Sequence, residues 1–169
     1  LITSLLSINF IDAQTIKDDE YKNRYLKEDF NIPGDYFPII TTSDNYFIID
    51  DGDYLMSRNN NESEYAVIAN SSLINNFILK TSVRIGPSKN KNASIGLIIK
   101  AQQDGKGAII FELNKKGEYR LKKLINNEYI NISNSENNGW IRNNKINTED
   151  LVNKIEIRSE NNLYEILIN

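Results

Sequence analysis

The chain has no cysteine and no histidine among its 169 residues. Without cysteine it can form no disulfide, no thiolate metal site and no cysteine nucleophile. Without histidine it can form no Ser-His-Asp triad, and no imidazole can serve as a general base or metal ligand. An enzyme built from this sequence would have to use carboxylates, lysine or tyrosine. The two absences therefore favour a binding or structural role over catalysis.

The chain also lacks an excess of positive charge. Its 20 Lys and Arg residues are scattered among 23 Asp and Glu residues, which gives a net charge of −3. Proteins that bind nucleic acid usually carry a clustered basic face, and no such cluster occurs here. No segment approaches the length needed to cross a bilayer as a helix. We therefore expect neither a nucleic-acid partner nor a membrane span.

The first residues are apolar and carry no charge before Asp12. The stretch "LITSLLSINF" is followed by "IDAQ" and then by the polar run "TIKDDEYKNR". This order is typical of the back half of a secretory signal peptide, with cleavage between Ala13 and Gln14. A buried first strand or helix is the alternative. Residues 1–13 thus predict an exported protein (secreted, periplasmic or at the cell surface), and residues 14–29 predict a polar N-terminal arm.

From residue 30 to residue 169 the dominant period is two, which is typical of β-strands. Glycine and asparagine turns separate about ten short apolar runs. A single flat sheet could not bury that many apolar faces, whereas two stacked sheets could. We therefore predict an all-β domain over residues 30–169, an antiparallel two-sheet β-sandwich. The last run alternates like a strand without a closing turn, so we expect the domain to continue past Asn169.

Three runs in the middle of the sequence predict a meander, a series of antiparallel hairpins. They cover residues 95–101, 108–114 and 118–124, and "EYINI" adds a fourth strand. In the third run, Tyr119 and Arg120 must point to opposite faces of the sheet, because adjacent side chains alternate. Residues 152–159 and 163–169 predict a last hairpin.

The order of these runs resembles the concanavalin A-like jelly rolls, especially bacterial laminin-G-like and laminarinase-like modules. The resemblance covers roughly residues 30–169 and consists of strand types in a fixed order. It rests on "FIIDDGDY" (47–54), "NNFILKTSVRI" (75–85), "SIGLIIKAQQDGKGAIIFELNKKGEYRL" (94–121), "GW" (139–140) and "NKIEIRSENNLYEILIN" (153–169). It implies a jelly-roll sandwich and leaves the function open, since one fold hosts many functions.

One part of the laminarinase-like pattern is missing. Catalytic members carry a Glu-x-Asp-x-x-Glu strand that supplies a nucleophile and an acid/base, and retaining glycosidases need such a pair. No such spacing occurs here. Glu62 and Glu64 lie in a polar loop, Glu112 stands alone on its predicted strand and Glu118 lies at a turn. The resemblance therefore implies a non-catalytic module.

The acidic turn at Asp50, Asp51 and Asp53 is the candidate metal site. Carboxylate oxygens at this spacing could bind Ca²⁺. The longer loop and distal Glu of a helix–loop–helix calcium site are absent, and an Asp-Gly turn forms readily without a metal. We expect no obligatory cofactor, and Ca²⁺ is the only metal that the sequence suggests.

Trp140, the single tryptophan, is the first candidate for ligand binding. An exposed indole can stack on the apolar face of a sugar ring, but a tryptophan in such a loop can also plug the end of a sandwich. Tyr119, Gln102 and Asp104 are further candidates, because tyrosine is amphipathic and loop amides and carboxylates can bind hydroxyl groups. Strand propensity and hairpin-turn chemistry explain these three residues equally well.

Three functions remain open from the sequence. The first is an exported, non-catalytic binding or accessory module for a glycan or a protein surface, part of a larger protein. The second is a glycoside-processing enzyme whose carboxylates meet only in space. The third is a purely structural interaction domain. A glycan binder predicts an exposed aromatic residue in a shallow groove flanked by Asn, Gln, Asp or Arg, whereas an enzyme predicts two converging carboxylates.

Overall fold

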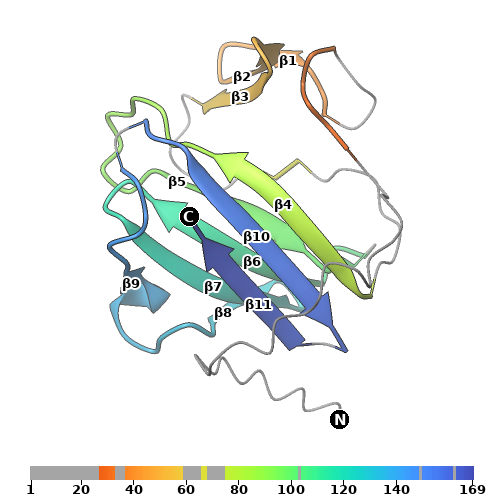
Figure 1. The fold of residues 1–169 in the computed structure, drawn as a ribbon, viewed down its shortest axis with the longest axis vertical. Coiled ribbons are helices and arrows are strands. Elements are labelled where there is room, and N and C mark those ends of the chain that lie inside the picture. The colour runs from red at the N-terminus through yellow and green to blue at the C-terminus, as the bar shows by residue number, and fades with distance from the viewer. Residues whose placement is uncertain are drawn as a thin grey trace. The chain divides into compact units, whose positions relative to one another are not determined.

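The computed structural model describes residues 27–32, 37–58, 66–67, 75–102, 104–148, 150–161 and 163–169. The chain divides into two compact units. Of the described residues, those from Asn75 onward belong to the larger unit, and those from Lys27 to Val67 belong to the smaller unit. The elements are labelled in Figure 1.

The predicted meander is confirmed in the larger unit. Its strands pair antiparallel in the order β5-β6-β7-β8, and the short strand β9 pairs with the other end of β7. Figure 1 shows these strands as one continuous sheet. The bounds are β5 (Ser94–Ile99), β6 (Gly107–Asn114), β7 (Glu118–Ile125), β8 (Glu128–Asn131) and β9 (Ile141–Arg142). The hairpin register places Glu112 opposite both Gly96 and Arg120.

A second antiparallel sheet has the order β11-β10-β4. Its strands are β4 (Phe77–Val83), β10 (Asn153–Glu160) and β11 (Leu163–Ile168). The hairpin predicted at the end of the sequence is confirmed as β10 and β11. Strand β4 comes from the middle of the chain and pairs with β10 across a long sequence separation, which local patterning could not have predicted.

The two sheets of the larger unit stack and bury one hydrophobic core between them. The fully buried part of that core includes Phe111 and Leu113 from β6 and Ile155 and Ile157 from β10. Phe77, Leu79 and Val83 of β4 pack against it, because side chains two residues apart share one face of a strand. Burial of one such side chain stabilises the fold by about 1.5–3 kcal/mol. The predicted class is therefore confirmed: this unit is an all-β, antiparallel two-sheet β-sandwich.

The β6 strand is buried on both of its faces, which sets it apart within its sheet. Phe111 and Leu113 face the core, while Glu112 and Asn114 on the opposite face are only 6% and 4% exposed. Strict alternation would place these two polar residues in water. Glu112 is bound by Arg120 and Lys122 instead, and Asn114 is bound by the β6–β7 turn.

The smaller unit holds a three-stranded sheet with the order β1-β2-β3. Its strands are β1 (Ile40–Thr41), β2 (Asn45–Asp50) and β3 (Asp53–Arg58). The rings of Phe30, Phe37 and Tyr54 contact one another, and the Tyr54 hydroxyl donates a hydrogen bond to the Pro38 carbonyl at 2.7 Å. The described strands of the sandwich begin with β4, whereas β1–β3 form a sheet of the smaller unit. The domain bounds, residues 30–169, stay a prediction.

Several predictions fall outside the described residues. These are the signal peptide at residues 1–13, nearly all of the arm at 14–29 and most of the apolar run at 63–70. Among the residues that the structure describes, no helix is long and apolar enough to cross a membrane.

Candidate functional site

The turn between β6 and β7 is organised by the side chain of Asn114. Its Oδ1 accepts hydrogen bonds from the backbone N–H groups of Lys116, at 2.9 Å, and Glu118, at 3.1 Å. Its Nδ2 donates to Glu118 Oε2 at 2.7 Å. Gly117 adopts a φ of 75°, which glycine does without steric cost. These bonds fix the Glu118 carboxylate at one end of the five-stranded sheet.

The loop that carries Trp140 is anchored to the same sheet by Ser133. Its hydroxyl donates to the Gly139 carbonyl at 2.6 Å and accepts from the Leu121 N–H at 3.0 Å. Gly139 has a φ of 85°, and a Cβ there would lie 2.9 Å from side-chain atoms of Asn131. No larger residue fits at position 139 without displacing Asn131, so the loop path and the placement of Trp140 depend on this glycine.

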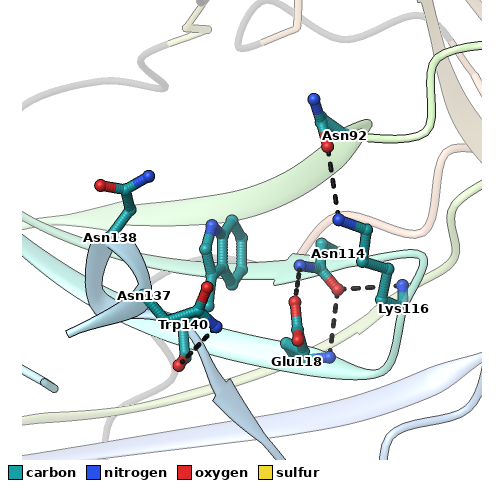
Figure 2. A pocket seen from close by; sticks show the side chains of 7 residues that line it. All are labelled: Asn92, Asn114, Lys116, Glu118, Asn137, Asn138 and Trp140. Carbon is teal, nitrogen blue, oxygen red and sulfur yellow. Dashed lines mark hydrogen bonds between the residues drawn. The ribbon is translucent and has the colours of Figure 1, made fainter.

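The turn and the loop enclose a pocket of ≈ 240 Å³ (Figure 2). We call it the Trp140 pocket. Its lining combines one indole ring, four side-chain amides, one carboxylate and one ammonium group. The lining residues are Trp140, Asn92, Asn114, Asn137, Asn138, Glu118 and Lys116. Figure 2 shows Trp140 standing between the pair Asn137 and Asn138 on one side and the β6–β7 turn on the other.

Trp140 is half-buried, and its ring lies against the Arg120 guanidinium. The Arg120 Cζ is 4.4 Å from the ring centroid, within the range of a cation–π contact. Arg120 alternates along β7 with Tyr119 and Leu121, which pack toward the core, so Arg120 and Trp140 lie on the outer face. Trp140 is not a member of the described core cluster, and it lines a pocket. Its role as a binding platform stays a prediction.

Arg120 is itself held by Glu112, its partner across the sheet. The Arg120 Nε donates to Glu112 Oε2 at 2.6 Å, and Nη2 donates to Oε1 at 3.3 Å, which is a bidentate geometry. Lys122 Nζ lies 3.1 Å from the same carboxylate and 4.5 Å from the Tyr129 ring centroid. Gly96 gives the carboxylate its room, because a Cβ there would lie 2.9 Å from Glu112 Cγ. One carboxylate thus orders two cations beside the pocket.

Tyr119, a candidate from the sequence, lies on the other side of β7 from the pocket. Its ring packs against the core and lies 6.3 Å from Phe111, measured between centroids. The predicted opposite orientation of Tyr119 and Arg120 is confirmed. Tyr119 therefore packs on the core-facing side of the sheet and is not part of the Trp140 pocket.

The burial of Tyr119 gives a testable pH dependence. Desolvation raises the pKa of its hydroxyl, and burial likewise raises the pKa of Tyr164. As the pH rises, the unfolded chain releases these protons first, near pH 10, so stability falls as the pH rises further through the folded-state pKa values. We expect Tyr119→Phe, and more so Tyr119→Phe/Tyr164→Phe, to flatten the loss of unfolding free energy between pH 9 and pH 11. Urea denaturation at each pH measures the unfolding free energy. If the double variant lost unfolding free energy with rising pH as steeply as the parent protein does, the prediction would be contradicted.

Gln102 and Asp104 lie at the opposite end of β6, in the β5–β6 turn. The Gln102 N–H donates to the Gly107 carbonyl at 2.8 Å, and Asp104 Oδ1 accepts from the Lys106 N–H at 3.0 Å. Both residues therefore stabilise a hairpin turn, and the structure does not bring them to the Trp140 pocket.

The acidic turn of the smaller unit joins β2 to β3. Asp50 pairs with Asp53, and the two residues between them have positive φ, 47° at Asp51 and 78° at Gly52. Two consecutive positive φ angles define the two-residue hairpin turn that favours Asp-Gly. Within the described ranges, no group of three or more acidic residues is placed to hold a metal ion. The hairpin alone accounts for these residues, and Ca²⁺ binding stays a prediction.

A second pocket, of ≈ 390 Å³, lies on the sheet formed by β11, β10 and β4. Its lining is Lys80, Thr81, Ser82, Lys154, Ile155, Glu156, Leu167 and Asn169. These described residues include no aromatic ring and no side-chain amide other than that of Asn169. The Trp140 pocket therefore offers the richer set of binding groups.

The structure thus defines a β-sandwich with a polar pocket, lined on one side by an indole ring, at one end of its larger sheet. Comparisons with protein-family models, curated proteins and solved structures found no match. The functional argument therefore depends on the chemistry of the pocket itself.

Proposed function

We propose that the chain is an exported, non-catalytic binding module that holds a sugar unit of a glycan in the Trp140 pocket. The observation that carries this proposal is the half-buried indole flanked by Asn92, Asn114, Asn137 and Asn138. The apolar face of a pyranose ring stacks on an aromatic face, while its hydroxyl groups need donors and acceptors around the edge. The exposed amides of Asn92, Asn137 and Asn138 provide both. Glu118, which the buried Asn114 holds in place, adds an acceptor.

The size of the pocket agrees with one sugar unit. Pockets for drug-sized ligands enclose roughly 300–1,000 Å³, and the Trp140 pocket, at ≈ 240 Å³, is smaller. A longer glycan would place one ring against Trp140 and extend along the outer face of the sheet. Because only one sugar ring would contact Trp140, we expect modest affinity for a glycan at a single pocket.

The composition of the pocket argues against glycoside hydrolysis there. Hydrolysis by the common mechanisms needs two carboxylates on either side of the scissile bond. The described part of the lining contains one, Glu118, and that carboxylate accepts a hydrogen bond from Asn114. A binding role makes use of a fixed acceptor of this kind, whereas a catalytic role would require a second carboxylate.

The family that we propose is the concanavalin A-like jelly roll, in its non-catalytic, laminin-G-like form. Two stacked antiparallel sheets support this proposal, as does a Gly139-Trp140 loop that lies against the larger sheet. Export rests on the apolar residues 1–13. A protein surface is the alternative ligand within the same family proposal.

A glycan-array screen of the whole chain, with and without Ca²⁺, tests the proposal. We expect binding to at least one class of glycan in the absence of Ca²⁺, because the pocket's groups are hydrogen-bonding side chains and one aromatic ring. Absence of binding to every glycan in both conditions would overturn the saccharide proposal and favour a protein-facing module.

A further inference from the structure

The sequence contains a single Asn-Gly pair, Asn138-Gly139, and it lies directly before Trp140. The backbone explains why these two residue types stand there. The φ angle is positive at both, 51° at Asn138 and 85° at Gly139, and asparagine and glycine adopt positive φ most readily. The same pair is chemically reactive, because glycine has no side chain to shield its backbone nitrogen from the neighbouring side-chain amide.

The reaction open to this pair is deamidation within the chain. The Gly139 backbone nitrogen bonds to Asn138 Cγ, the bond from Cγ to Nδ2 breaks, and the amide leaves as ammonia with the proton of the Gly139 N–H. Water then opens the five-membered succinimide ring that has formed. Opening at Cγ gives aspartate, whereas opening at the main-chain carbonyl gives isoaspartate, in which the chain runs through Cγ. Water is the only other reactant.

The folded loop holds the reacting atoms apart. The ring can close only when the Gly139 nitrogen lies on the same side of the Cα–C bond as the Cβ of Asn138. The ψ angle of 33° at Asn138 places that nitrogen nearly opposite Cβ. The proton that must leave is also held, because the Gly139 N–H donates to the Glu136 carbonyl at 2.8 Å. Although the Asn138 side chain is exposed, Gly139 is buried. Attack therefore requires the loop to open.

Contacts on both sides of the reacting bond resist this opening. Rotation about ψ of Asn138 would swing its carbonyl, which lies 3.5 Å from Arg120 Nη1. It would also move Gly139, whose carbonyl accepts a hydrogen bond from the Ser133 hydroxyl at 2.6 Å. Gly139 has little space in which to move, since a Cβ on it would lie 2.9 Å from side-chain atoms of Asn131. The anchors that place Trp140 thus also restrain the reaction.

We propose that Asn138 is a site of spontaneous deamidation that the folded loop keeps nearly unreactive, so that the modification occurs when the loop opens. Aspartate at this position adds a negative charge to the pocket lining. Isoaspartate also lengthens the main chain by one carbon atom directly before the tightly packed Gly139, and so it displaces Trp140. The consequence for glycan binding rests on the proposed function, whereas the modification itself does not.

Peptide mass spectrometry of the whole chain tests this inference. The protein is incubated at mildly alkaline pH, folded in one sample and unfolded by urea in the other. Tandem spectra of the tryptic peptide 124–142 locate the mass increase that accompanies conversion of an amide to an acid. We expect Asn138 to react fastest among the asparagines of that peptide in the unfolded chain, and at least about tenfold more slowly in the folded chain. Equal rates, or an Asn138 that stays intact in urea, would overturn the proposal.

The variant Ser133→Ala isolates the anchor of the loop. We expect the folded variant to deamidate at Asn138 about fivefold faster than the folded parent protein, because one hydrogen bond that restrains Gly139 is lost. Ser82→Ala is the matched control, since Ser82 is an exposed serine on β4 of the other sheet and its loss should leave the rate unchanged. Circular dichroism establishes that both variants are folded. A folded Ser133→Ala protein that reacts no faster than the parent would contradict the restraint by the loop.

The isoaspartyl form, separated by ion exchange and refolded, tests the consequence for Trp140. Its tryptophan fluorescence should differ from that of the parent protein more than the fluorescence of Asn138→Asp does, because only isoaspartate changes the path of the chain. Fluorescence identical to that of Asn138→Asp would overturn the proposed displacement. A displaced Trp140 with unchanged affinity for the best array glycan would instead overturn saccharide binding at this pocket and leave the deamidation site intact.

Discussion

Replacing Trp140 by alanine is expected to weaken glycan binding about thirtyfold, or by about 2 kcal/mol. Among the described residues that line the pocket, the indole is the only aromatic ring, so its loss removes the stacking surface while the amides remain. Trp140→Phe keeps part of that surface, so its glycan affinity should lie between that of Trp140→Ala and that of the parent protein. Isothermal titration with the best glycan from the array measures all three proteins.

The matched control for this prediction is Tyr129→Ala. Tyr129 lies on β8 of the same sheet, is 55% exposed and also lies over a cation, yet it does not line the pocket. We expect the Tyr129→Ala variant to bind the glycan with the same affinity as the parent protein. Circular dichroism and a thermal melt establish that each variant is folded. A folded Trp140→Ala protein with unchanged affinity would show that the indole is no platform.

The second large effect concerns stability. Glu112→Ala is expected to lower the unfolding free energy by about 3–5 kcal/mol, since it leaves two buried cations without their shared carboxylate. The side chain of Lys122 is only 4% exposed and that of Arg120 only 16%, so water cannot replace the lost partner without local rearrangement. Urea denaturation at neutral pH measures the change.

A triple variant separates charge from packing in this prediction. Glu112→Leu/Arg120→Met/Lys122→Met removes all three charges together, and we expect it to be as stable as the parent or more so. Lys80→Ala, which breaks a more exposed ion pair with Glu156 on the other sheet, should cost less than about 1 kcal/mol. A loss below about 1 kcal/mol in Glu112→Ala would mean that this cluster is not what orders the outer face.

The strands of the sandwich could be predicted because period-two patterning is local. The β5–β6–β7 meander is carried by apolar runs separated by glycine turns, and its register follows from the short hairpins. The alternation also correctly placed Tyr119 and Arg120 on opposite faces. By contrast, the pairing of β4 with β10 joins segments about seventy residues apart, and no pattern within either strand specifies it.

The candidate site was only partly predictable. Trp140 stood out because it is the only tryptophan, yet the sequence could not say whether it was a plug or a platform. Glu112 seemed isolated, because Arg120 and Lys122 follow it on another strand and approach it only through the hairpin register. The register of the predicted β6–β7 hairpin places Arg120, eight residues after Glu112, directly opposite it. That register is the sequence signal from which the Glu112–Arg120–Lys122 cluster could have been predicted.

The amides of the pocket were harder to foresee. Asparagine is abundant throughout the chain, so Asn92, Asn114, Asn137 and Asn138 do not stand out from their neighbours. They come together because the loop before β5, the β6–β7 turn and a loop some twenty residues later meet at one end of the sheet. The Asp-Gly turn at residues 51–52 shows the opposite case, since its geometry was evident from the sequence alone.

The most direct test of saccharide binding at Trp140 is a nitrogen-15 NMR titration of the whole chain with the best array glycan. The single tryptophan gives a single indole N–H signal, which reports on the pocket without ambiguity of assignment. Our account predicts that this signal shifts on binding, together with side-chain amide signals of Asn137 and Asn138. A glycan that leaves the indole signal in place and shifts Lys154 and Leu167 of the other sheet would contradict it.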